Sequence, residues 1–216
     1  MNSIQLNTLF VYSDNSPVMN SDPLGNVSIS SVKTSVDLCI NSPNPNSSVV
    51  FAQKGRDFTA GHVYLVLNPG KDQNLKKKYG TCAFGFAPRS QRTMVITIQQ
   101  FLNPKVYARG RIMDESKNRF SVFVRFNITK TQFENVVKYK NKMQKSPPNY
   151  NLIKFNCATF ALSVLEKAGI KHKFKPKFWN FGANLLFFLM LGVRKLYFKG
   201  YTPAQMAYDV LHGKIK

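Results

Sequence analysis

The sequence contains few of the residues that build metal centres and disulfide frameworks. It has three cysteines and three histidines in 216 residues, and no two cysteines form a CxxC pair. Zinc sites combine several such ligands at short, characteristic spacings, so no metal site is expected. The odd number and wide separation of Cys39, Cys82 and Cys157 also argue against a disulfide framework. We therefore expect neither a metal nor any other cofactor.

Acidic residues are scarce as well. The chain carries 10 Asp and Glu against 31 Lys and Arg, which gives a formal net charge of +21. Such an excess of positive charge says little about the fold. It favours anionic partners, which include nucleic acid, acidic lipid, an anionic cell-wall polymer or an acidic binding protein.

The sequence also lacks long hydrophobic runs. Residues 1–10 contain no basic segment followed by an apolar core, so no secretory signal peptide is expected. The longest apolar stretch, residues 181–193, contains an asparagine and two glycines and is too short to span a bilayer. We expect a protein made in the cytoplasm, which leaves the cell, if it does, by a route that needs no cleaved signal.

The order of the expected elements predicts an α+β domain. Apolar alternation and short apolar runs predict strands at residues 31–40, 61–67, 81–86, 93–98 and 120–128. Helical spacing predicts helices from Thr129 or Thr131 to about residue 143, over residues 157–168 and over residues 203–211. Strands followed by helices favour a mainly antiparallel sheet packed against helices.

Three other segments are expected to lie outside this regular structure. Residues 1–30 are polar and are expected to form an N-terminal arm, which leaves residues 31–216 as the domain. Residues 68–78 contain Pro-Gly and four lysines and are expected to be a solvated hairpin loop. Residues 178–216 are expected to form a C-terminal helical extension.

Asn156 and Cys157 open the most informative segment of the chain. Apolar residues recur every three or four positions after them, which predicts an amphipathic helix. Asn156 is a favourable N-cap, so Cys157 falls in the first turn, where unpaired backbone N–H groups and the helix dipole favour a thiolate. The cysteine is then either a nucleophile or a buried structural residue.

A thiolate nucleophile needs a base that exchanges its proton near neutral pH, and histidine is the usual one. His172 lies in a lysine-rich loop, which indicates a surface residue, and His212 precedes Gly213 at a helix end. His62 follows Gly61 at the start of the most apolar strand, where it is well placed to face a helix N-terminus at the sheet edge. The alternative is a histidine that simply completes a strand end.

The order Gly61-His62 and then Asn156-Cys157 resembles that of the circularly permuted papain-like cysteine hydrolases. These are the permuted NlpC-type cell-wall peptidases and the lecithin:retinol acyltransferase-like enzymes, in which the histidine strand precedes the cysteine helix. Asn-Cys followed by a small residue, Thr159 and Phe160 is similar to their nucleophile motif.

A narrower resemblance is to toxin domains attached to Rhs-repeat and type VI secretion proteins. It extends over the hairpin FGFAP at residues 84–88, the sequence Tyr-Asn-Leu at 150–152 before Asn156-Cys157, and TPAQM at 202–206. The chain departs from that pattern in residues 1–30, 71–78 and 178–193.

The resemblance implies a permuted papain-like core in which Cys157 is the nucleophile at a helix N-terminus and His62 is general base and then general acid. It further implies that the backbone N–H of Cys157 helps to hold the oxyanion. Asn156 would cap the helix and Tyr150 would support the thiolate, unless both are purely structural. The residue that orients His62 is expected on the returning strand, where Thr81 or a backbone carbonyl is available; otherwise the site is built differently.

These observations leave three hypotheses for function. The leading one is a cysteine amidase or peptidase that acts through a thioester as a secreted antibacterial toxin on peptidoglycan peptides. An acidic immunity protein and a carrier in the secretion apparatus are the partners that this hypothesis implies. The second keeps the site but gives it a lipid ester or acyl chain, with residues 181–193 in peripheral contact with a membrane. A buried core helix is the other interpretation of that stretch.

The third hypothesis is a non-enzymatic, basic nucleic-acid-binding protein. Basic and aromatic residues are mixed over residues 109–126, as in proteins that bind single strands: Arg109, Arg111, Arg119, Phe120, Phe123, Arg125 and Phe126. Alternation places the phenylalanines on both faces of a strand, and no helix-turn-helix, zinc finger or RNP-like motif is present. Nucleic acid is therefore the least favoured partner.

Overall fold

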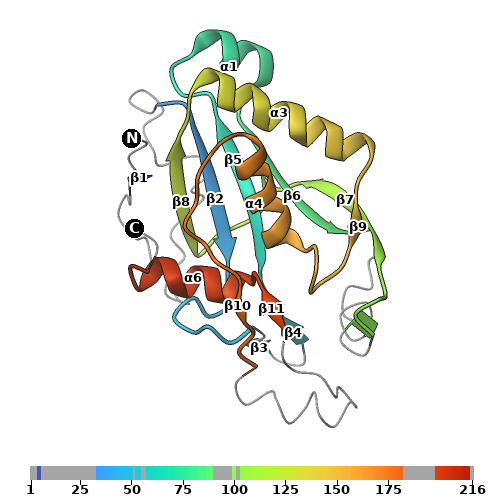
Figure 1. The fold of residues 1–216 in the computed structure, drawn as a ribbon. Helices are drawn as coiled ribbons and strands as arrows, with labels where there is room; N and C mark the ends of the chain where they lie inside the picture. The colour runs from blue at the N-terminus through green and yellow to red at the C-terminus, as the bar shows by residue number, and fades with distance from the viewer. Residues whose placement is uncertain are drawn as a thin grey trace.

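The computed structural model describes residues 4–5, 33–50, 52–54, 57–89, 99–100, 103–181 and 198–214. Its centre is a seven-stranded sheet in which every neighbouring pair is antiparallel (Figure 1). In spatial order the strands are β1 (Ile4–Gln5), β8 (Val122–Asn127), β2 (Ser35–Asn41), β5 (His62–Asn68), β6 (Cys82–Pro88), β7 (Ala108–Asp114) and β9 (Asn149–Tyr150). The predicted α+β class with an antiparallel sheet is confirmed.

Helices pack on this sheet and complete the fold. Helix α4 (Cys157–Lys167) lies against β5 and β6, while α6 (Pro203–Leu211) lies against β2 and β8 (Figure 1). Helix α3 (Lys130–Lys145) contacts α4 and β7, and the short α1 (Gln73–Tyr79) lies beside α3 through the ring contact of Tyr79 with Phe133. In the part of the chain that the structure describes, none of the helices has both the length and the apolar character needed to cross a membrane.

Two small antiparallel ladders lie outside the main sheet. They are β3 (Ala52–Lys54) with β4 (Asp57–Thr59), and β10 (Lys177–Phe178) with β11 (Lys199–Gly200). The second ladder joins the segment after α4 to the segment before α6. The predicted C-terminal helical extension, residues 178–216, thus contains β11 and α6, and residues 182–197 fall outside the described part of the chain.

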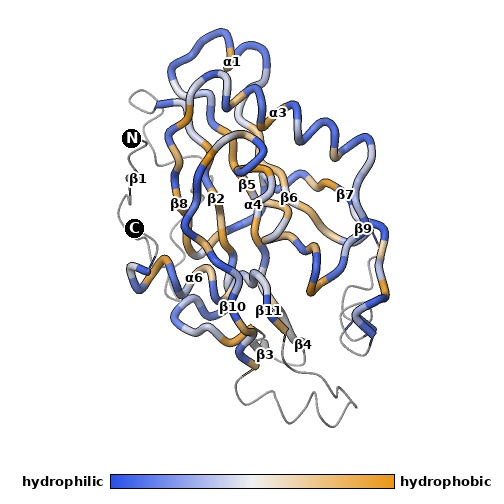
Figure 2. Tube along the Cα trace, in the orientation of Figure 1, coloured by the Kyte–Doolittle hydropathy of each residue, from blue (hydrophilic) through white to orange (hydrophobic). Residues whose placement is uncertain are grey.

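The sheet buries apolar side chains on both faces. The larger cluster combines alternate residues of β2, β5, β6 and β8 with side chains of α3, α4 and α6. The smaller cluster lies on residues of opposite parity and contains Cys39, Tyr64, Val66 and Ala83, with Phe120 and Phe123 packed against it. Figure 2 shows that the central strands are largely hydrophobic, whereas the outer sides of α1 and α3 are hydrophilic.

Helix α3 begins at the first of the two predicted threonines. The Thr129 hydroxyl accepts a hydrogen bond from the Gln132 N–H at 3.2 Å, and the Gln132 side chain accepts one from the Thr129 N–H at 3.0 Å. This is a reciprocal capping box with glutamine in the third helical position. The spacing of Thr131 and Glu134 is therefore not used as a cap.

One prediction about local structure was wrong, and one strand was not predicted. Residues 68–78 are not all hairpin loop, because Asp72 caps α1 by accepting a hydrogen bond from the Leu75 N–H at 3.0 Å, and Leu75 is buried. One buried leucine and one cap are enough to anchor a lysine-rich helix. The strand β7 was also missed. The predicted strand at residues 93–98 and nearly all of the predicted N-terminal arm lie outside the described residues.

A buried ion pair joins β2 to β8. Asp37 lies opposite Arg125 in the ladder, and its carboxylate accepts two hydrogen bonds from the guanidinium, at 2.8 and 2.7 Å. Both residues are buried. Arg125 is therefore not part of an exposed nucleic-acid-binding surface, and Phe126, which belongs to the core, is not available for base stacking either.

Replacing Arg125 with alanine is expected to destabilise the fold, because it leaves the Asp37 carboxylate buried without its counter-charge. The expected loss in the free energy of unfolding is about 3–5 kcal/mol. Urea denaturation measures it, with the exposed Arg111→Ala as the control that removes the same charge. A loss no larger than that of Arg111→Ala would show that the pair does not matter for stability.

Candidate active site

The N-terminus of α4 is held by Asn156. Its side-chain oxygen accepts a hydrogen bond from the Thr159 N–H at 2.9 Å, and its amide nitrogen donates to the backbone oxygens of Leu152 and Tyr201 at 2.8 and 3.0 Å. The predicted N-cap is confirmed. Cys157 is the first residue of α4 and is only 7% exposed. Its sulfur thus lies where the helix dipole and free backbone N–H groups favour negative charge.

His62 is the first residue of β5 and follows a glycine in the left-handed conformation. The preceding Gly61 has φ +75°, and a side chain there would collide with the carbonyl oxygen of Asn41 in the neighbouring strand. The His62 ring interacts with Cys157 through a hydrogen bond and through charge. Its Nε2 lies 2.9 Å from Oε1 of Glu115.

The surroundings of His62 favour its protonated form. Burial lowers the pKa of His62, but the charge of Cys157, the hydrogen bond with Cys157 and the contact with Glu115 outweigh burial and raise the pKa to about 10. The imidazolium is then the stable form at neutral pH. The Cys157 side chain and the Glu115 side chain both contact the ring.

Glu115 was not predicted. The sequence favours Thr81 or a backbone carbonyl as the partner of the His62 ring, whereas the structure places Glu115 there. In the β5–β6 ladder Leu67 lies opposite Cys82, so Thr81 lies beyond the end of the ladder that is farthest from His62. Glu115 instead comes directly after β7, where its N–H donates to the Ala83 carbonyl at 3.2 Å. Its side chain is 0% exposed, whereas that of His62 is 25% exposed.

Tyr150 lies close enough to Cys157 for the two side chains to influence each other. It is buried and its ring packs on Phe86, with centroids 5.7 Å apart. Burial, and after it the charge of Cys157, raise the pKa of Tyr150, so the phenol stays neutral. Support of the thiolate by Tyr150 remains a prediction.

The chain that leads into Cys157 is fixed by a buried glutamine that sequence analysis missed. Gln100 donates from its side-chain nitrogen to the Tyr150 carbonyl at 3.2 Å and accepts from the Leu152 N–H at 2.8 Å. Gln100 itself is 0% exposed. These bonds set the path of the loop between β9 and α4, and so the position of Cys157.

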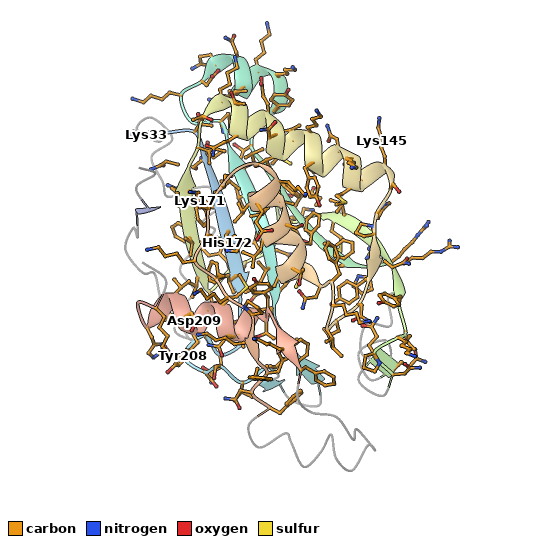
Figure 3. All side chains as sticks on the ribbon, in the orientation of Figure 1. Lys33, Lys145, Lys171, His172, Tyr208 and Asp209 are labelled. Atoms are coloured by element: carbon orange, nitrogen blue, oxygen red, sulfur yellow. The ribbon has the colours of Figure 1, made fainter. Side chains whose placement is uncertain are left out.

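The other two histidines occupy structural positions. His172 lies after α4 (Figure 3) and its Nε2 is 3.1 Å from a carboxylate oxygen of Glu166, in the last turn of that helix. His212 follows α6, where its Nδ1 lies 2.9 Å from the Tyr208 carbonyl. The contact of His212 agrees with its interpretation as a helix-end histidine, whereas the side chain of His172 is only 6% exposed, so the expectation of a surface residue was wrong.

Gly85 leaves room for the contact between His62 and Glu115. A Cβ built at Gly85 would lie 2.5 Å from Oε1 of Glu115 and 2.9 Å from Nε2 of His62. The strand therefore needs glycine here because a side chain would occupy the space of the His62–Glu115 contact.

Gly85→Ala is accordingly expected to lower the rate at which iodoacetamide alkylates Cys157 near neutral pH by about tenfold, since a misplaced His62 stabilises the thiolate less. Mass spectrometry of the labelled peptide measures this rate. Ala87→Gly, a change at a half-buried position of the same strand, serves as the control. An alkylation rate for Gly85→Ala equal to that of the wild type would mean that the contact does not need this space.

No metal-binding group is apparent near this site. The described residues include no cluster of three His, Cys, Asp or Glu side chains suited to a metal ion, and all three cysteines are free. Comparisons with protein-family models, curated proteins and solved structures found no match. The site is therefore interpreted from its own geometry.

Proposed function

We propose that the protein is a cysteine hydrolase that cleaves an amide bond through a thioester intermediate. Cys157 is the nucleophile, His62 its proton-transfer partner and Glu115 the residue that orients His62. The observation that carries this proposal is the position of the His62 ring, which contacts Cys157 and, through Nε2 at 2.9 Å, the buried carboxylate of Glu115. Nucleophile, base and orienting acid in hydrogen-bond sequence are what thiol catalysis requires.

The first half of the reaction uses the charged pair. The Cys157 thiolate attacks the carbonyl carbon, and the backbone N–H at the start of α4 stabilises the oxyanion that forms. His62, protonated because of its raised pKa of about 10, donates its proton to the leaving nitrogen. The C–N bond breaks, the amine leaves, and the acyl group remains on Cys157 as a thioester.

The second half uses the same histidine as a base. Once Cys157 is acylated it carries no charge, so its contributions to the pKa of His62 disappear while burial, the largest influence, still lowers that pKa. Neutral His62 then removes a proton from water, and the hydroxide attacks the thioester. The thiolate leaves and the pair with protonated His62 is restored.

A permuted papain-like core is the architecture that this proposal implies. The order along the chain supports it, because the histidine strand β5 comes first, Glu115 after β7 follows, and the cysteine helix α4 comes last. The histidine thus precedes the cysteine, the reverse of papain, and this agrees with the resemblance drawn from Gly61-His62 and Asn156-Cys157.

Peptidoglycan peptides are the substrate that we propose, and a secreted antibacterial toxin is the role. The net charge of +21 favours an anionic wall polymer, and equally an acidic immunity protein or secretion carrier as partner. Lysines extend from several elements of the surface, among them Lys33, Lys145 and Lys171 (Figure 3). The alternative substrate, a lipid, depends on residues 181–193, of which only Phe181 is described; it is buried against Trp179 and Phe198.

Digestion of two purified substrates separates these proposals. Wild type and Cys157→Ala are incubated with peptidoglycan sacculi and with anionic phospholipid vesicles. New amino groups from peptidoglycan, absent with Cys157→Ala, are the expected result. Release of fatty acid from the vesicles, without products from peptidoglycan, would favour a lipid-directed hydrolase over an amidase. The absence of products from both substrates would contradict both proposed activities.

A further inference from the structure

We propose that Asn118 is a positioning residue that holds the Glu115 carboxylate against His62, and that Tyr64 fixes Asn118 in turn. This inference rests on the proposed function, because it concerns the same cysteine and histidine. It extends the site by two residues that do not contact the sulfur. The geometry points to them through a continuous series of hydrogen bonds.

The Glu115 carboxylate has a separate partner for each oxygen. Oε1 lies 2.9 Å from Nε2 of His62, and Oε2 accepts a hydrogen bond from the side-chain amide of Asn118. Because the Glu115 side chain is 0% exposed, an oxygen without a donor would carry a large desolvation cost. The Asn118 amide supplies that donor, and by occupying Oε2 it directs Oε1 towards His62.

The turn that carries Glu115 is closed by further bonds to Asn118. The Asn118 N–H donates to the Glu115 carbonyl at 2.9 Å, while the Glu115 N–H donates to Ala83 of β6 at 3.2 Å. Residues 115–118 thus form a compact turn fastened to the sheet at one end. Its other end is fastened by a side chain from β5.

Tyr64 provides that second attachment. Its hydroxyl donates to the Asn118 carbonyl at 2.9 Å, and its ring stacks near that of His62, with centroids 6.1 Å apart and planes at 20°. Tyr64 is 1% exposed, and burial raises its pKa, so the hydroxyl keeps its proton and remains a donor. One strand therefore carries both the base, His62, and the anchor of the turn that orients it.

A positioning role can be told apart from a purely structural one at Asn118. The residue is exposed and lies in a turn, where aspartate is as well tolerated as asparagine. Asn118→Asp keeps the size and the turn preference but replaces the donor by an acceptor and places a negative charge beside Oε2 of Glu115. A structural role predicts little change for this variant, whereas a positioning role predicts a larger loss than for Asn118→Ala.

The test is the rate of alkylation of Cys157 by iodoacetamide in the full chain, measured peptide by peptide at about pH 6 and about pH 9. Near pH 6 we expect Asn118→Ala to react about tenfold more slowly than wild type, Asn118→Asp more slowly still, and Tyr64→Phe to change in the same direction. The differences should shrink near pH 9, where an ordinary thiol also ionises. Lys117→Ala, an exposed change in the same turn, is the control and should react like wild type.

Failure of the inference and failure of the proposed function give different results. If Cys157 in the wild type reacts no faster than Cys82 near pH 6, the proposed function itself is contradicted. Fast wild-type Cys157, slowed by Glu115→Gln but unchanged in folded Asn118→Asp, would overturn only the role of Asn118. If circular dichroism shows that Asn118→Asp does not fold, Tyr64→Phe decides, and a wild-type rate for that variant overturns the proposal.

Discussion

Cys157→Ala is expected to release no measurable product from the substrate that wild type cleaves, a loss of at least about 10⁴-fold in turnover, because no other group replaces the nucleophile. Among the three cysteines, Cys157 alone is contacted by a histidine that a carboxylate orients. The measurement is the appearance of new amino groups over hours, so that a residual rate is detected.

Cys82→Ala is the matched control for this change. Cys82 is partly exposed on β6, where Lys140 donates to its sulfur at 3.2 Å, and it has no role in the proposed reaction. This variant is expected to keep wild-type turnover. Turnover that survives in Cys157→Ala, or that is lost in Cys82→Ala instead, would assign the chemistry to another residue.

His62→Ala is expected to slow the alkylation of Cys157 near pH 6 by roughly 10- to 100-fold. An ordinary thiol is ionised to only about 1 part in 300 at that pH, and its greater intrinsic nucleophilicity offsets part of this loss. In the wild type the raised pKa of His62 keeps the imidazolium, the charge that would stabilise a thiolate in the proposed pair, present up to about pH 10. The alkylation rate should therefore be nearly independent of pH in wild type and rise with pH in the variant.

His212→Ala removes a histidine that contacts Tyr208 of its own helix and should behave like wild type. Its rate separates loss of the pair from a general effect of removing an imidazole. Alkylation of His62→Ala that is as fast and as insensitive to pH as in the wild type would show that His62 does not stabilise the thiolate.

Much of the fold is visible in local sequence patterns. The apolar run of β5 and the alternation of β8 predict strands, and the helical spacing after Asn156 predicts α4 together with its cap. Such patterns do not predict strand β7, because its inward-facing positions hold the small residues Ala108 and Gly110 between exposed arginines. A strand of that kind has little hydrophobic contrast, and pairing with β6, distant along the chain, determines it.

Some residues of the candidate site can likewise be predicted from local sequence, and others cannot. Cys157 and His62 are each marked by a neighbour with a local role, the N-cap Asn156 and the left-handed Gly61. Glu115 has no such mark, because only the pairing of β6 with β7 brings it to His62, 53 residues away along the chain. Gln100 likewise reaches its backbone partners from 50 and 52 residues away. Long-range contacts of this kind leave no periodic pattern in one sequence.

NMR titration of the His62 ring tests most directly whether Cys157 and His62 form a thiolate–imidazolium pair. The chain has only three histidines, so their ring signals can be assigned by single substitutions. In wild type, His62 is expected to stay protonated up to about pH 10, and in Cys157→Ala its pKa should fall because the largest influences that raise it are gone while burial remains. A His62 that titrates at the ordinary histidine value in both proteins would contradict the pair.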